Sequence, residues 1–108
     1  MNISELDSSD INILIDVMVK AQKLKDEGSS RKITLDTQAK DVFEKLNKVK
    51  SDKSNTTELR RRIFSSLTID EEKTEPINNF LDEVLGKGND SGINDLKTKL
   101  QDYVHFTF

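Results

Sequence analysis

Residues 74–85 read Thr-Glu-Pro-Ile-Asn-Asn-Phe-Leu-Asp-Glu-Val-Leu and decide the fold class, because they form the cleanest amphipathic pattern in the chain. The apolar residues recur at i, i+3, i+4, i+7 and i+8, which is the spacing of one face of an α-helix. Pro76 would break a helix interior but is favoured in a first turn. We therefore predict a helix that begins near Thr74 or Glu75 and buries one face, which is formed by Ile77, Phe80, Leu81, Val84 and Leu85.

Two helices with the same kind of spacing are expected in the first half of the chain. The first begins at an N-cap provided by Ser8, Ser9 or Asp10, and it ends at Gly28, since glycine favours helix termination. The second covers about residues 36–50. Their apolar stripes contain Ile11, Leu14, Ile15, Met18, Ala21 and Leu24 in the first helix, and Leu35, Ala39, Val42, Phe43, Leu46 and Val49 in the second.

Two more helices flank the deciding segment. A third helix is predicted after the polar loop 51–55, with Asn55, Thr56 or Thr57 as its N-cap. A last helix is predicted to start at Asp90 or Ser91. The apolar positions are Leu59, Ile63, Phe64 and Leu67 in the third helix, and Ile93, Leu96, Leu100 and Tyr103 or Val104 in the last.

These patterns predict one all-α domain over residues 1–108: a compact bundle of four to five short amphipathic helices with an extended aromatic C-terminal tail. Residues 1–8 and 104–108 are left open as flexible tails. The expected core consists of Ile11, Leu14, Ile15, Met18, Val42, Phe43, Leu46, Ile63, Leu67, Ile77, Phe80, Leu81, Val84, Leu96 and Leu100.

Two apolar features exceed what a simple bundle needs. Val17 and Val19 widen the stripe of the first helix, which is then either buried on several sides or keeps an apolar strip for a second protein. In the tail, Val104, Phe106 and Phe108 alternate as on one face of a strand. That tail either closes a groove of the bundle, for instance by pairing with residues 31–35, or docks on a partner.

Charge is unevenly distributed along the chain. Residues 31–62 contain ten Lys or Arg against five acids, whereas residues 63–95 contain two Lys against eight acids, within a total net charge of −3. Such a pattern is typical of segments that attract each other inside one fold, and it also fits a basic patch that faces a partner.

Composition leaves little room for catalysis. The chain has no cysteine, its single histidine is His105, and no Gly-x-Ser-x-Gly motif or glycine-rich phosphate loop is present. Isolated carboxylates without His or Cys do not define a metal site. We therefore expect neither an enzyme nor a metal or cofactor site. With no apolar run of membrane-spanning length and no signal-peptide pattern, a cytoplasmic protein is expected.

The function that remains best supported is a small non-enzymatic protein-binding module of the adaptor, inhibitor or chaperone-like kind. Homo-oligomerisation is left open. The alternative is a nucleic-acid-associated protein that uses the Lys/Arg-rich segment 40–62, although a pI of about 5.2 makes nucleic acid the weaker candidate. The candidate partner-binding residues are Arg60, Arg61, Arg62, Lys48, Tyr103, Phe106 and Phe108.

The chain bears a family resemblance. The length, the four or five short helices and the aromatic end together resemble the antiparallel bundles of bacteriocin immunity proteins over about a third of the chain. The matching stretch is residues 67–72, Leu-Thr-Ile-Asp-Glu-Glu, which precede a Leu/Ile-striped helix. The strongly basic balance expected of those proteins is missing here. The lean core and polar surface are also similar to small helical components and chaperones of bacterial secretion systems. These resemblances imply a helical, immunity- or secretion-related binding protein, and no functional residue is transferred from them.

Overall fold

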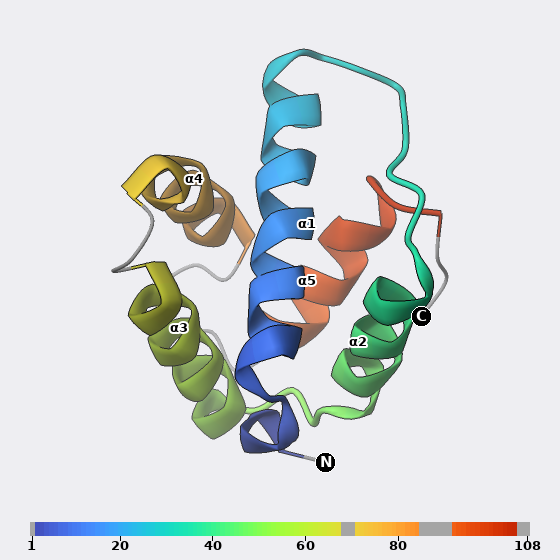
Figure 1. Ribbon diagram of the computed structural model, residues 1–108. Coiled ribbons are helices and arrows are strands. Elements are labelled where there is room, and N and C mark those ends of the chain that lie inside the picture. Colours follow the sequence, from blue (N-terminus) through green and yellow to red (C-terminus); the bar gives the residue numbers. More distant parts are fainter. Residues whose placement is uncertain (1, 68–70, 85–91, 106–108) are drawn as a thin grey trace.

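The computed structural model describes residues 2–67, 71–84 and 92–105, and the chain there is helical, as the sequence predicts (Figure 1). The elements follow in the order η1 (Ile3–Glu5, a 3-10 turn), α1 (Ser8–Asp26), α2 (Thr37–Lys48), α3 (Lys53–Leu67), η2 (Glu71–Lys73, a second 3-10 turn), α4 (Thr74–Val84) and α5 (Gly92–Gln101). The expected all-α bundle of four to five helices is confirmed.

Helix α1 is the centre of the bundle. It packs against α2, α3 and α4, while α5 packs against α3 and α4. Figure 1 shows α3 and α4 on one side of α1, α2 on the other side, and α5 behind it. A helix with three packed neighbours needs a wide apolar face, and this explains why Val17 in addition to the predicted stripe is buried.

The cap of α1 lies one residue earlier than the three candidates. Asp7 is the N-cap, and its carboxylate accepts a hydrogen bond of 2.8 Å from the backbone N–H of Asp10. The Asp10 carboxylate accepts in return from the Asp7 N–H at 3.2 Å, so that the two form a reciprocal capping box. At the other end, Gly28 adopts φ +62° and turns the chain out of the helix, as predicted.

The start of α3 is a correction of the same kind. The helix begins at Lys53, because the Asp52 carboxylate accepts a 2.8 Å hydrogen bond from the N–H of Asn55. Asn55, Thr56 and Thr57, the predicted caps, therefore lie inside the first turns. The short, charged Asp side chain caps as well as Asn does, and here it lies three residues ahead of the first predicted cap.

Helix α4 begins at Thr74 with Pro76 in its first turn, as predicted. The 3-10 turn η2, which includes Glu71, directly precedes it. Helix α5 begins at Gly92, and its predicted caps Asp90 and Ser91 lie outside the described residues.

Every predicted core residue except Val84 is buried in the core. The side chain of Val84 lies outside what the structure describes. Phe43, at the middle of α2, and Phe80, at the middle of α4, are its largest fully buried side chains. The described apolar residues that are buried beyond the predicted set are Ile3, Leu6, Val17, Ala21, Leu35, Ala39, Val49, Leu59, Ile93 and Val104.

Residues at both ends of the described chain join this core. Ile3 and Leu6, in the segment left open as a flexible tail, are each only 1% exposed. Near the other end, Val104 is buried and forms an isolated parallel β-bridge with Ile33. This pairing confirms, for Val104, the alternative in which the tail meets residues 31–35. Phe106 and Phe108 lie outside the described residues.

No helix among the described ranges combines the length and the apolar character needed to cross a bilayer.

Candidate functional site

The three arginines proposed as binding residues contact their own chain. Arg62 is half-buried, and its Nη1 donates to the carbonyl oxygens of Ile3, at 3.1 Å, and of Leu6. These bonds run from α3 to the N-terminal turn η1 and the residue after it. Arg62 is thus a structural residue that fixes the start of the chain.

Arg61 and Arg60 have other partners. Arg61 Nε donates to Glu58 at 3.0 Å, one turn earlier on α3, and this hydrogen bond, with the attraction of the two charges, raises the pKa of Arg61 and lowers that of Glu58. Arg60 Nη2 lies 3.8 Å from Asp82 Oδ1 on α4. For Arg60, the expected attraction between the basic segment and the acidic α4 is therefore present.

The other predicted site residues do not join the arginines. Lys48 is exposed at the end of α2, on the other side of α1 from α3 (Figure 1). Tyr103 follows α5 and is half-buried, with Lys99 Nζ 5.8 Å from its ring centroid. Phe106 and Phe108 fall outside the described part of the chain. The predicted residues that are described therefore do not form one surface.

A different set of residues converges on a groove beside α1. After Gly28 the chain turns back, so that residues 31–33 run alongside the C-terminal half of α1 (Figure 1). Between them lies a hollow of about 320 Å³, which continues into a smaller one of about 130 Å³ through the shared Lys20 and Ile33. We call the two together the α1 groove. It is lined by Ile13, Asp16, Val17, Lys20, Lys23, Leu24, Glu27, Arg31, Lys32, Ile33, Thr34, Leu35, Asp36 and Ala39.

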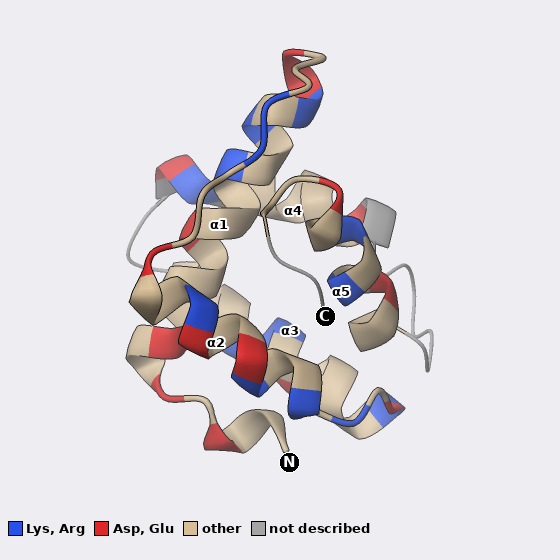
Figure 2. Cartoon of the chain, turned by 90° about the vertical axis from the view of Figure 1, so that its right-hand side faces the viewer, with Lys and Arg blue, Asp and Glu red and all other residues tan. Residues whose placement is uncertain are grey.

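We call the hollow of about 320 Å³ the upper part of the α1 groove and the hollow of about 130 Å³ its lower part. The upper part is positively charged. Of the described residues that line it, four are cationic and only Glu27 is acidic. All four are exposed, and their side chains have no ion pair or hydrogen bond within the part of the chain that the structure describes. Figure 2 shows basic residues on the returning segment next to basic residues on α1. The four are Lys20, Lys23, Arg31 and Lys32.

Each acid of the lower part holds a partner of its own, and neither forms an ion pair with one of the four cations. The Asp16 carboxylate accepts a 2.8 Å hydrogen bond from Lys73 Nζ in η2. The Asp36 carboxylate caps α2 by accepting from the Ala39 N–H at 2.8 Å. The four cations therefore retain a local excess of positive charge in a chain with net charge −3.

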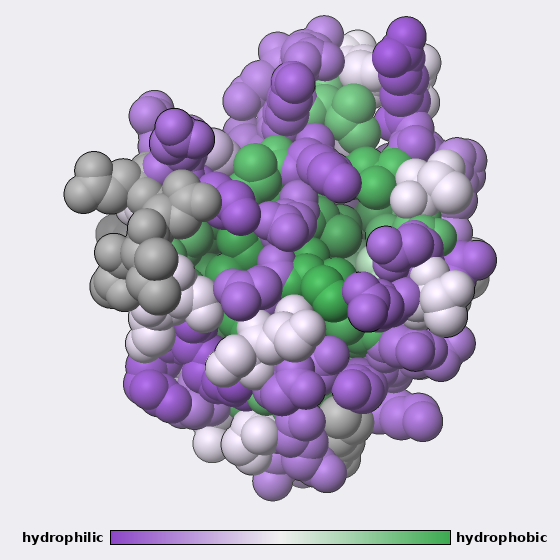
Figure 3. All heavy atoms as spheres, in the orientation of Figure 1, coloured by the Kyte–Doolittle hydropathy of each residue, from purple (hydrophilic) through white to green (hydrophobic). Residues whose placement is uncertain are grey.

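The floor of the α1 groove is apolar. Ile13, Leu24 and Ile33 are half-buried along it, and Val17 is buried between them. Figure 3 shows apolar atoms exposed between polar side chains on the face of the molecule where α1 lies. A concave surface with an apolar floor and a charged rim is typical of protein-binding sites.

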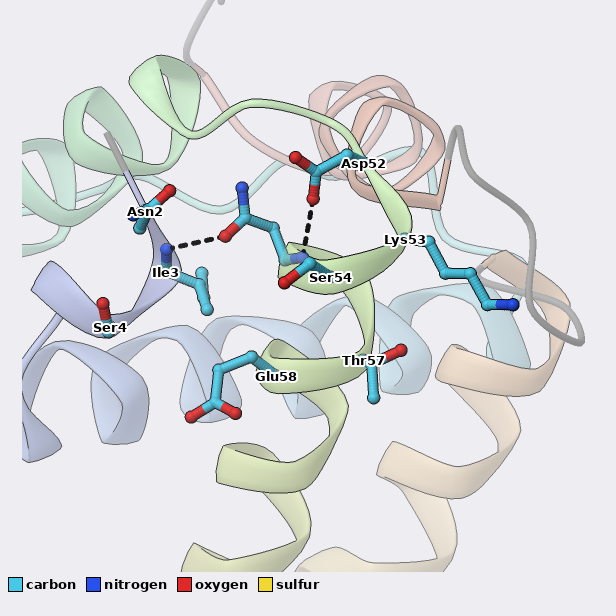
Figure 4. A pocket seen from close by; sticks show the side chains of 9 residues that line it. Asn2, Ile3, Ser4, Asp52, Lys53, Ser54, Thr57 and Glu58 are labelled. Atoms are coloured by element: carbon cyan, nitrogen blue, oxygen red, sulfur yellow. Dashed lines mark hydrogen bonds between the residues drawn. The ribbon is translucent and has the colours of Figure 1, made fainter.

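A larger hollow, of about 680 Å³, lies where the N-terminal turn η1 meets the start of α3 (Figure 4). Its central polar groups are already bonded: Asn55 Oδ1 accepts from the Ile3 N–H at 3.2 Å, and Asn55 Nδ2 donates to the Lys50 carbonyl at 2.8 Å. The Asp52 carboxylate is used as the cap of α3. These bonds hold the N-terminus in place, and no set of like charges converges there.

Metal binding and homology add no other site. Among the described residues, no three His, Cys, Asp or Glu side chains are grouped so that they could hold a metal ion. Comparisons of the chain with protein families, curated proteins and solved structures give no match.

Sequence reasoning missed the α1 groove although it noticed both of its walls. It identified the widened apolar stripe of the first helix and the short extended stretch 31–35 as separate features. The Lys/Arg-rich composition of residues 40–62 places the basic patch there instead. The missing information was that residues 31–33 fold back onto α1, which depends on the bridge between Ile33 and Val104.

Proposed function

We propose that this chain is a small non-enzymatic protein-binding module, of the adaptor or inhibitor kind, and that the α1 groove is its binding surface. The observation that supports the proposal is the convergence of four cationic side chains without internal partners above an apolar floor. Having no cysteine, the chain suits a reducing compartment, and we propose a cytoplasmic location.

The two parts of the groove would contribute differently to binding. Burial of Ile13, Leu24 and Ile33 by a partner would supply affinity, because each still exposes apolar surface to water. The cations would accelerate association and select an acidic partner over a basic one. Since the groove lies between one helix and one returning segment, a single segment of the partner fits it better than a broad folded surface.

Two features favour a protein over a nucleic acid as the partner. Among the described residues, no aromatic side chain lines the α1 groove, so that they offer bases nothing to stack on. In the Lys/Arg-rich segment 40–62, Lys45 bonds to Asp10 at 3.0 Å, and Arg60, Arg61 and Arg62 have the internal partners described above. That segment therefore offers phosphates fewer cations than its composition suggests.

Affinity capture from the native host with three forms of the protein tests this function. The groove variant carries Lys23→Glu and Arg31→Glu, and the control variant carries Lys40→Glu and Lys48→Glu on α2, so that both change the net charge equally. All four residues are exposed. We expect the wild type and the control to retain the same protein, quantified by mass spectrometry, and the groove variant to lose it. Loss from both variants, or from neither, would contradict the proposal.

A further inference from the structure

The returning segment beside α1 forms one isolated β-bridge with the C-terminal tail. Ile33 donates its N–H to the Tyr103 carbonyl at 2.7 Å and accepts from the His105 N–H at 3.0 Å, which makes a parallel bridge with Val104. In strand geometry, the N–H and C=O of one residue point to the same edge, and those of its neighbours point to the opposite edge. The N–H and C=O of Ile33 thus face the tail, and in an extended chain the N–H and C=O of Lys32 and of Thr34 face away from it.

That second edge is unpaired. Lys32 and Thr34 are both exposed, and within the described ranges neither residue's backbone N–H nor its C=O takes part in a hydrogen bond. Both residues line the α1 groove. An exposed strand edge with free donors and acceptors is a template on which another extended chain can pair.

We propose that the partner binds the α1 groove through an acidic, extended segment that adds as a strand to the edge formed by Lys32 and Thr34. This inference rests on the protein-binding function proposed above and names the chemistry of the segment bound. Its backbone pairs with the free N–H and C=O groups of Lys32 and Thr34. Carboxylates meet the cations of the groove, and the aliphatic side chains between them meet Leu24 and Ile33.

Three properties of the groove select this occupant. The cations without internal partners attract negative charge. The apolar floor favours aliphatic side chains, which an extended chain presents at alternate positions. The edge offers a C=O beside each N–H. A polypeptide pairs with both groups, whereas the phosphates of a nucleic acid accept hydrogen bonds but donate none.

A synthetic peptide tests the inference directly. The probe is a fluorescent heptapeptide in which Glu and Val alternate, with both ends blocked, and binding to the full chain is measured by anisotropy at low and moderate salt. We expect saturable binding that weakens with salt, and at least tenfold weaker binding to the variant with Lys23→Gln and Arg31→Gln. Absence of binding to the wild type would overturn the inference.

Backbone methylation separates strand addition from simple charge attraction. Two further peptides carry N-methyl groups either on every Val amide or on every Glu amide, because these two sets of N–H groups point to opposite edges of a strand. We expect methylation of one set of amides to weaken binding at least tenfold relative to the unmethylated peptide. Methylation of the other set should change the affinity by no more than about threefold, because the proposed site pairs with only one edge of the peptide. Equal effects of the two sets would overturn strand addition.

A nucleic-acid control and the capture experiment complete the test. Tighter binding of a thymidine heptanucleotide than of the Glu/Val peptide would contradict the acidic-segment inference. The protein-binding function fails separately, when capture of the host partner does not depend on Lys23 and Arg31. If capture depends on them but the heptapeptide does not bind, the function stands and the inference about the bound segment is wrong.

Discussion

Several polar residues in this small protein serve backbone groups that helices leave unpaired. Arg62 donates to the carbonyls of Ile3 and Leu6, and Lys97 Nζ donates to those of Asn47 and Val49, each at 3.1 Å. Helix ends and turns expose such carbonyls, and burying them without a partner costs free energy. Long cationic side chains from other helices provide the missing donors.

Arg62 and Arg61 are adjacent in sequence but should differ in their effect on stability. We expect Arg62→Gln to lower the free energy of unfolding by about 1–3 kcal/mol, because it leaves the part-buried Leu6 carbonyl without a donor and removes the second donor to the Ile3 carbonyl. Arg61→Gln breaks only an exposed pair with Glu58 and should leave the urea midpoint nearly unchanged. Equal shifts in the two urea titrations would contradict the structural role assigned to Arg62.

Lys97 gives the stability a dependence on pH. Its side chain is buried on α5, and this desolvation lowers its pKa below the ordinary 10.5. Between the lowered value and 10.5, the unfolded chain binds a proton that the folded chain has released, so that stability contributed by this residue rises with pH.

Comparison with Lys97→Met isolates that effect from other titrations. We expect the difference in unfolding free energy, wild type minus variant, to increase as the pH rises from neutral toward 10.5. Urea denaturation at a series of pH values measures it. A difference that stays constant or decreases would show that burial does not lower the pKa of Lys97.

Helix α4 is the element whose pattern and packing agree best. Ile77, Phe80 and Leu81 are at most 1% exposed, and the helix packs against α1. The pattern alone predicted the element because its stripe is continuous and the Pro in its first turn marks the start. In α1 and α3, the stripe predicted the helix, but the caps Asp7 and Asp52 lie before the first candidates.

Phe80→Ala tests the packing of α4. Removing this side chain leaves a cavity in the core, and we expect a loss of about 3–5 kcal/mol in the free energy of unfolding. Asn79→Ala, an exposed neighbour on the same helix, is the control and should change stability little. A loss below about 1 kcal/mol for Phe80→Ala would place its ring at the surface.

We expect the C-terminal segment to contribute to the thermal stability of the fold. Deleting residues 104–108 removes the buried Val104 and its bridge to Ile33, and we expect a lower melting temperature. Val104→Ala should reproduce part of the loss, whereas His105→Ala, which keeps the backbone N–H, should not. An unchanged melting temperature after the deletion would mean that the segment serves only a partner.

At the scale of the whole molecule, the sequence predicted the helices and most of the core but not the site. Helices follow from local spacing, which one sequence displays. The position of Arg62 against Ile3, and of residues 31–33 against α1, depends on contacts between residues far apart in the chain. Sequence alone therefore suggested the arginines on α3 as a surface patch, whereas the structure gives each of them an internal partner.

The total charge of the molecule likewise does not reveal the site. A net charge of −3 and a pI of about 5.2 describe an acidic protein, yet cations without internal partners gather at one end of α1. Local charge, not the total, determines which partner an exposed groove attracts. The convergence of four such cations above an apolar floor is why we assign binding to the α1 groove and not to the basic segment 40–62.

Hydrogen–deuterium exchange of the protein, free and in complex with its captured partner, tests the central claim most directly. We predict that protection on binding is concentrated in the C-terminal half of α1 and in residues 31–35, including the amides of Lys32 and Thr34, which are unpaired in the free protein. Protection centred on α3 around Arg60–Arg62, or at the hollow beside Asn55, with none along the α1 groove, would contradict the account.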